Sequence, residues 1–159
     1  MSMAIDPKVF RQTLGKFATG VTVIAVAEGD EVHAMTANAF TSVSLDPPLI
    51  LVCIDHRART LPMIRNAGKF AVNVLTAEQE NLSRLFARQA VDEEPSFTFE
   101  SIEDSAPLLN GALAGMDCTV VQDIEAGDHA VLIAHVDRIV TGDGEPLCFY
   151  QGRYAKLAT

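Results

Sequence analysis

Four histidines and three cysteines are the side chains in this sequence best suited to bind a metal ion or to act as a nucleophile. Two of them, His129 and His135, are six residues apart, so on a strand both would point to one face. No third ligand follows at the spacing typical of zinc sites, and the sequence has no HExxH or CxxC motif. We therefore expect no metal site.

Serine chemistry and the common nucleotide motifs are missing as well. Ser42 and Ser44 lack the GxSxG elbow of hydrolases, and no residue stands out as their base or orienting acid. Neither the Rossmann glycine motif nor the P-loop motif occurs. Any cofactor must be held in another way.

The stretch MTANAFTSVSLDPP, residues 35–48, offers such a way. It is nearly chargeless and rich in small and hydroxyl side chains, which let backbone N–H groups come close to a flat polar ring. The segment HRART, residues 56–60, leads into a predicted helix, and an arginine with a helix N-terminus can bind a phosphate. Two interpretations stay open here: Arg57 and Arg59 bind a ligand, or they are solvated loop charges with Thr60 as a simple cap.

The composition argues against other classes of partner. Twenty-one acidic against twelve basic residues give a net charge of −9, and no block of lysine or arginine offers a footprint for nucleic acid. Cys53, Cys118 and Cys148 are widely spaced in apolar runs, which indicates free thiols and a reducing cytoplasm. The sequence shows no signal peptide and no apolar run approaching about twenty residues, so we expect no membrane association.

The elements that must position these residues are mainly strands. The chain of 159 residues fits one domain, residues 1–159, with a single core. Short strands linked by hairpin turns suggest a closed or nearly closed antiparallel barrel, because closure removes exposed strand edges. We expect strands at residues 21–27, 32–37, 49–54, 69–75, 117–125 and 129–140, with further strand residues in PLCFYQGRY.

Three helices are expected, each with a recognisable N-cap. They cover residues 7–19 after Asp6, residues 61–68 after Thr60, and about residues 77–87 within the capping-box pattern TAEQ. The first should end at Gly20. Residues 88–110 are acidic and marked by prolines, which is typical of a surface excursion with at most short elements.

Five segments resemble the flavin reductase-like family, whose fold is an FMN-binding split β-barrel. They are FRQTLGKFATGVTVIA, MTANAFTSVSLDPPLILVCI, FAVNVLTAEQENLSRLFA, GDH and YQGRY, in this order, over about residues 8–157. The resemblance implies a mainly β, antiparallel, Greek-key-like barrel with peripheral helices. It also implies the activity of the small reductase components of two-component flavin-dependent monooxygenases, which use NADH or NADPH to reduce FMN or FAD.

The same resemblance implies which residues bind the flavin and the nicotinamide. The flavin-binding residues it implies are Thr36, Ala37 and Asn38 along the isoalloxazine, Ser42, Val43 and Ser44 beside the ring and ribityl chain, and Asp55, Arg59 and Thr60 near the ribityl and phosphate. His129 of GDH would be the catalytic residue facing the nicotinamide, with Tyr154 near the same pocket. The structural alternative for His129 is a turn histidine packed at the start of a strand.

One part of the sequence departs from the family pattern. Many relatives carry serines in the phosphate loop where this chain has Arg57 and Arg59, so the number of phosphate contacts and the choice between FMN and FAD stay open. Asp46, Pro47 and Pro48 are expected to form a stiff exit from the flavin-lining loop into the next strand.

The resemblance further implies a homodimer with flavin sites near its interface and a flavin-dependent monooxygenase as partner. Three other functions stay open. The chain could be a flavoredoxin-like electron carrier that holds FMN tightly, an oxidase of the pyridoxamine-phosphate type on a related barrel, or a barrel that has lost flavin and serves only in interactions.

Overall fold

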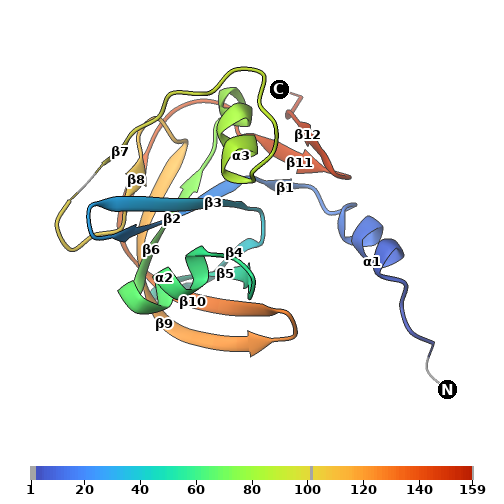
Figure 1. Ribbon diagram of the computed structural model, residues 1–159, viewed down its shortest axis with the longest axis horizontal. Coiled ribbons are helices and arrows are strands. Elements are labelled where there is room, and N and C mark those ends of the chain that lie inside the picture. Colours follow the sequence, from blue (N-terminus) through green and yellow to red (C-terminus); the bar gives the residue numbers. More distant parts are fainter. Residues whose placement is uncertain (1–2, 101, 159) are drawn as a thin grey trace.

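The computed structural model describes residues 3–100 and 102–158, and its main feature is a seven-stranded antiparallel sheet in the order β3-β2-β6-β9-β10-β5-β4 (Figure 1). A second sheet, β1-β11-β12, and a short pair, β7-β8, lie beside it. The strands are β1 (Thr19–Gly20), β2 (Thr22–Glu28), β3 (Glu31–Ala37), β4 (Phe40–Leu45), β5 (Pro48–Asp55), β6 (Lys69–Val74), β7 (Phe99–Glu100), β8 (Leu108–Leu109), β9 (Ala114–Ala126), β10 (His129–Thr141), β11 (Cys148–Tyr150) and β12 (Arg153–Ala155). The helical elements are α1 (Pro7–Leu14), α2 (Thr60–Ala67), the 3₁₀ turn η1 (Ala77–Gln79) and α3 (Glu80–Phe86).

The link between β3 and β4 forces the large sheet to roll up. These strands lie at opposite edges of the sheet, yet only Asn38 and Ala39 separate them in the chain. In a flat sheet six gaps of about 4.8 Å would place the edges about 29 Å apart, whereas the three steps from Ala37 to Phe40 reach at most about 11 Å. The sheet therefore curls into a barrel that is split between β3 and β4. The strand pattern predicted a closed or nearly closed barrel, and the family resemblance implied a split one. We call Asn38 and Ala39 the barrel seam.

The core of the barrel is filled from alternate positions of the long strands. On β5, Ile50, Val52 and Ile54 are buried, and Val52 pairs with Leu132 of β10. Their neighbours Leu51 and Cys53 point to the other face and are only partly covered, because side chains alternate along a strand. Strand β5 is apolar on both faces for two reasons. One face packs in the closed core, and the other lines a cavity that a ligand can reach.

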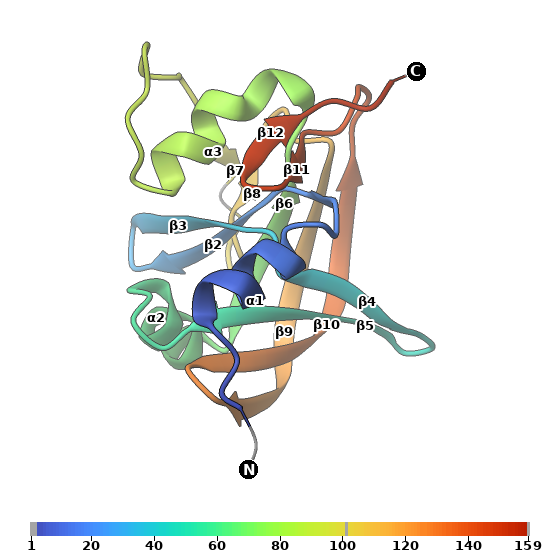
Figure 2. The ribbon, with the colours of Figure 1, turned by 90° about the vertical axis from the view of Figure 1, so that its right-hand side faces the viewer.

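A second apolar cluster joins the small sheet to α3. Val21, Val23, Leu75, Leu82 and Leu147 are buried in it. The predicted capping box is present: the Thr76 side chain accepts from the Gln79 backbone amide, and the Gln79 side chain accepts from the Thr76 backbone amide at 2.9 Å. It begins the helical segment as expected and directs α3 toward the end of β3, on the opposite side of β3 from α2 (Figure 2).

The first helix is shorter than predicted. Its N-cap is Asp6 as expected, with the Asp6 side chain accepting a hydrogen bond of 2.9 Å from the Lys8 amide. The helix ends at Leu14 rather than near Gly20 because the next residues belong to other partners: the Gly15 carbonyl accepts from the Gln151 amide, and Thr19 pairs with Phe149 of β11. Long-range pairing has overridden a local helical pattern.

Two further local predictions were wrong. Residues 40–45 are not a loop but strand β4, which pairs with β5 from Phe40 to Leu45 with one register shift. Thr60 is not a cap but the first residue of α2; Arg59 occupies the N-cap position without a side-chain cap bond. The Thr60 hydroxyl of α2 instead donates to the sulfur of Met35 on β3 at 2.8 Å. The described residues 88–100 and 102–110 hold two short strands, β7 and β8, as expected.

Asn73 of β6 connects three strands and should be important for stability. Its side chain is fully buried, donates to the Val23 carbonyl at 3.2 Å and accepts from the Leu109 amide at 2.8 Å. We expect Asn73→Ala to lower the free energy of unfolding by about 2–4 kcal/mol, because two buried backbone groups lose their partners. Urea denaturation measures the change. Asn110→Ala, which removes an exposed bond to Thr98, should change it by less than about 0.5 kcal/mol; equal effects would contradict this account.

Candidate functional site

Three cavities lie around the end of β3 and the barrel seam, and neighbouring cavities share residues there. The Asn38 cavity, of about 670 Å³, is bounded by Asn38, Phe40, Leu51 and Cys53. The arginine cavity, of about 420 Å³, is bounded by Thr36 and three arginines. The Tyr154 cavity, of about 140 Å³, shares Thr36 with the arginine cavity and Asn38 with the Asn38 cavity. The end of β3 and the barrel seam therefore form one continuous candidate site.

The Asn38 cavity is mainly apolar with one amide on its wall. Leu51 and Cys53 line it because they occupy the face of β5 that points away from the core. Leu14 and Phe17, in and after α1, form the opposite side. The Asn38 amide is 3.4 Å from the Thr19 hydroxyl, which keeps its polar atoms at the cavity. Such a cavity suits a flat ring with a polar edge.

The arginine cavity is held in shape by one ion pair. Asp55, the last residue of β5, accepts from the Arg57 backbone amide at 2.8 Å and from its guanidinium at 3.1 and 2.9 Å. These bonds hold the pKa of the Asp55 carboxyl well below its usual range, and the carboxylate raises the pKa of Arg57. Arg59 and Thr60 follow on the same wall, and Arg88, just after α3, lies on another. The arrangement can bind an anion.

At the Tyr154 cavity the predicted residues Thr36 and Tyr154 meet two residues of α3, Ser83 and Arg84, that the sequence did not indicate. The Thr36 hydroxyl donates to the Ser83 carbonyl at 2.6 Å, and the Ser83 hydroxyl shares a 2.6 Å hydrogen bond with the Tyr154 hydroxyl. The Arg84 guanidinium lies 4.8 Å from the centre of the Tyr154 ring. The capping box indicated the helix that carries Ser83 and Arg84, but no local signal showed that this helix would pack against β3.

His129 and Tyr154 are not in one pocket within a single chain, contrary to expectation. His129 begins β10 and pairs with Asp55 of β5, so it lies beside the Asp55–Arg57 ion pair. Tyr154 lies on β12, at the end of the molecule opposite to the β9–β10 turn (Figures 1 and 2). The His129 Nδ1–H donates to Asp128 at 2.7 Å, which lowers the pKa of the Asp128 carboxyl. His129 is thus close to the Asp55–Arg57 ion pair and distant from Tyr154.

Ser42, Val43 and Ser44 lie apart from the three cavities. They belong to β4, where a register shift between Ser42 and Ser44 leaves Val43 without a pairing partner on β5. Ser42 and Val43 are exposed on this projecting hairpin, and none of the three side chains lines the cavities described above (Figure 2). Their contact with a flavin remains a prediction.

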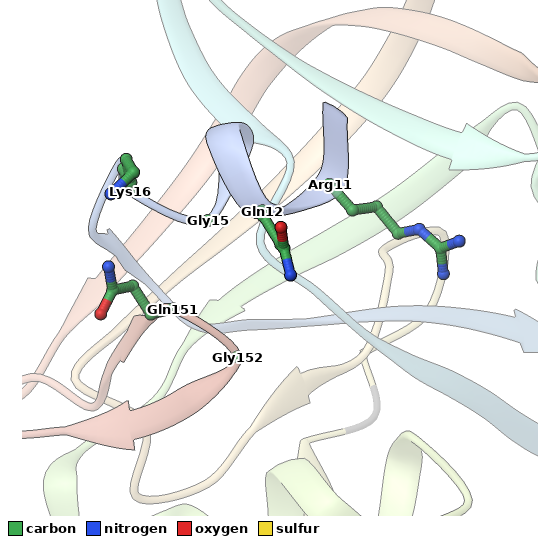
Figure 3. A pocket seen from close by; sticks show the side chains of 6 residues that line it. All are labelled: Arg11, Gln12, Gly15, Lys16, Gln151 and Gly152. Carbon is green, nitrogen blue, oxygen red and sulfur yellow. The ribbon is translucent and has the colours of Figure 1, made fainter. Parts of the chain in front are cut away.

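A further hollow, of about 480 Å³, lies between the end of α1 and the turn of the β11–β12 hairpin (Figure 3). Lys16 and Gln151 lie on one side of it and Arg11 extends to the other. It shares Arg11, Gly15 and Gly152 with the Asn38 cavity but contains none of the predicted site residues. Within residues 3–100 and 102–158, no cluster of three metal-binding side chains occurs. No helix among them is long and apolar enough to cross a membrane.

Comparison with known proteins decides the family. The profile of the flavin reductase like domain matches residues 14–158, which is nearly the whole chain. The chain belongs to this family. All of the cavity residues discussed above except Arg11 fall inside the matched range.

Individual members of the flavin reductase-like domain family are similar over almost their full length. The NADH-dependent flavin reductase of Rhodococcus sp is 44% identical, with 96% of this chain and 90% of that protein covered. The reductase subunit HsaB of a flavin-dependent monooxygenase from Mycobacterium tuberculosis is 36% identical, with 99% and 86% covered. The solved structure of the flavin reductase PheA2 is 43% identical, with a TM-score of 0.91 over 98% of this chain and 100% of that one. The predicted split barrel is confirmed.

The ion pair in this flavin reductase-like chain makes a testable pH prediction. Because the pKa of Asp55 is lowered in the folded state, the pair stabilises the fold at pH values above about 4, where a free aspartate is ionised, and this contribution is lost as the pH falls through the lowered pKa. Carbon NMR of the Asp55 carboxyl should show the low pKa. Arg57→Ala should raise it toward the free value, and Arg153→Ala should not. An unchanged titration in Arg57→Ala would contradict the assignment.

Proposed function

We propose that this chain is an NAD(P)H-dependent flavin reductase that transfers a hydride to FMN or FAD and supplies the reduced flavin to a partner monooxygenase. One observation carries the proposal: an apolar cavity at the barrel seam is joined to a cation-lined cavity beside β3 through the Tyr154 cavity, which shares Asn38 with the first and Thr36 with the second. A flavin nucleotide has the same two parts, a flat ring system and a phosphate. The relatives named as an NADH-dependent flavin reductase and as a monooxygenase reductase subunit support it.

The Asn38 cavity is the place for the flavin ring in this proposal. Phe40 and Leu51 offer apolar surface, and the Asn38 amide offers a donor and an acceptor to the polar edge of the ring. Burial raises the pKa of the Cys53 thiol, so this side chain is a neutral apolar contact and not a thiolate nucleophile. Thr36 and Arg59 continue the site toward the phosphate.

The protein's contribution to the reaction is orientation. A bound flavin supplies the electron acceptor for the nicotinamide hydride, so the protein needs no acid–base pair for the transfer. Holding the two rings in the right geometry is worth up to about 7–11 kcal/mol in favourable cases. His129 orients the nicotinamide in this proposal: Asp128 binds Nδ1 and so directs Nε2 toward a ligand.

The openness of the site favours flavin as a substrate over a tightly held cofactor. Asn38 and Ala39, which line the Asn38 cavity, are both exposed. A reductase must release its reduced flavin to a partner, whereas a flavoredoxin-like carrier must retain it. The three cysteines are free thiols, which fits a cytoplasmic protein.

We also propose that the protein is a homodimer with α1 at its interface. No residue of α1 is buried, and the helix stands away from the barrel (Figure 1). Its apolar side chains Val9, Phe10 and Leu14, and Phe17 beyond it, are all more than half exposed. An eight-residue helix is not stable alone, so its apolar face requires a covering surface.

A spectrophotometric assay of NADH and NADPH oxidation with FMN, FAD and riboflavin tests the function. We expect a nearly colourless protein that oxidises NADH when flavin is added, with His129→Ala lowering kcat/KM for NADH by about 10- to 100-fold because the nicotinamide loses its orientation. His135→Ala is the matched control, since both histidines are 40% exposed and bound to a neighbouring aspartate. A strongly yellow protein that fails to reduce free flavin would favour the carrier. Unchanged KM and kcat in His129→Ala would exclude its role.

Sedimentation velocity tests the dimer. A charge on the apolar face of α1 must be desolvated to form the interface, so we expect Phe10→Asp to convert a dimer into a monomer. Leu157→Asp, at an exposed leucine outside α1, should leave the dimer intact. A wild-type monomer, or a Phe10→Asp dimer as stable as the wild type, would contradict the proposed interface.

A further inference from the structure

Among the residues that the structure describes, Arg11 is the one charged side chain on the wall of the Asn38 cavity. It lies in the last turn of α1. The Gly15 carbonyl at the end of this helix accepts a 2.8 Å hydrogen bond from the Gln151 amide, which ties α1 to the turn of the β11–β12 hairpin across the hollow of Figure 3. The backbone that carries Arg11 is therefore anchored beside the place proposed for the flavin ring.

The charge of Arg11 is not neutralised within the described part of the chain. No carboxylate there lies within 4.0 Å of its guanidinium. Residues 7–27 and 146–159, which both contribute to the cavity wall, contain none of the 21 acidic residues. An acidic protein thus keeps an unpaired cation beside an apolar cavity, where charges attract each other more strongly than in bulk water.

The proposed reaction creates negative charge in this cavity. A hydride carries two electrons and one proton: the C4–H bond of the nicotinamide breaks, an N–H bond forms at N5 of the flavin, and the nicotinamide ring becomes cationic. The flavin then holds one negative charge, centred on N1 and the C2 carbonyl, until it takes up a second proton.

The Asn38 cavity has no side chain suited to donate that second proton. No aspartate, glutamate, histidine or lysine of the described residues lines it. Cys53 is the ionisable group there besides Arg11, and burial raises the pKa of its thiol, which makes it a poor donor. A cation is then the means that the cavity offers to balance the charge of the reduced ring.

We propose that Arg11 is a catalytic residue whose guanidinium stabilises the negative charge that hydride transfer places on the N1–C2 carbonyl edge of the flavin. This inference rests on the proposed function, which puts the flavin ring in the Asn38 cavity. Because the charge develops only during the transfer, Arg11 stabilises the transition state more than the bound oxidised flavin. The matched family profile begins at residue 14, so Arg11 lies outside it.

Anaerobic titration with oxidised and reduced FMN tests this role without turnover. Arg11→Gln should weaken the binding of reduced FMN about tenfold and that of oxidised FMN less than about twofold, since only the reduced ring is an anion. Arg11→Lys keeps the charge and should stay within about threefold of the wild type. Lys16→Gln is the matched control, because Lys16 lines the same hollow but not the Asn38 cavity. Thermal melting and sedimentation velocity confirm the fold and oligomeric state of each variant.

The absorption spectrum of the bound reduced flavin gives a second measure, since its anionic and neutral forms differ in colour. A nearby cation favours the anion and lowers the N1 pKa below that of free reduced FMN, and Arg11→Gln should raise this pKa by about 1. In turnover, Arg11→Gln should lower kcat about tenfold with KM for NADH little changed. A wild-type N1 pKa equal to that of free reduced FMN would overturn the inference.

Riboflavin separates the flavin ring from its phosphate. The tenfold loss must persist with reduced riboflavin, which has no phosphate, and a loss confined to FMN would assign Arg11 to the phosphate and overturn the inference. Equal losses for oxidised and reduced flavin, or equal effects of Arg11→Gln and Lys16→Gln, would overturn it as well. A wild type that does not oxidise NADH contradicts the proposed function, whereas the contrast between reduced and oxidised flavin still decides whether Arg11 stabilises the anion.

Discussion

The two-residue link between opposite edges of the large sheet is the constraint on which the rest of this structure depends. Because Asn38 and Ala39 must connect β3 to β4, the barrel closes up to this point and remains split there. The Cys53 amide donates to the Ala39 carbonyl at 3.0 Å, which anchors the seam to β5. Exposed backbone and small side chains therefore occur together at one place on an otherwise well-paired barrel. The Asn38 cavity and the Tyr154 cavity both lie at this seam, since Asn38 lines both.

The side chains at the seam suit the binding of a reactive cofactor better than chemistry of their own. Regular strands leave few catalytic side chains at the opening, and the residues that line it are small, apolar or amide-bearing. A site of this kind can bind and orient a reactive cofactor but has little reactivity of its own. The charged residues lie in the segments beside the seam. Asp55 at the end of β5 binds the Arg57 guanidinium, and Arg88 follows the C-terminal end of α3. In the proposed function, different parts of the fold therefore bind the ring and the phosphate.

Local sequence patterns correctly predicted the features that depend on neighbouring residues, such as helix caps and strands. The Asp6 cap, the capping box at Thr76 and the long apolar strand from His129 are all present as expected. Predictions were wrong where distant segments compete: β11 takes Thr19 out of the first helix, and β5 turns residues 40–45 into a strand. The hydrogen bond between Ser83 and Tyr154 joins residues 71 apart, and no short motif encodes such a contact. The family resemblance supplied site residues that composition and periodicity could not, and those on β4 lie away from the cavities.

The proposed place of the flavin is the seam of the barrel. A crystal structure of this protein with flavin bound is the decisive measurement. We expect the flavin ring against Phe40, Leu51 and Cys53, with its polar edge at Asn38 and its phosphate directed toward Arg59. A flavin bound instead on the outer face of β4, or in the hollow between α1 and the β11–β12 turn, would contradict it.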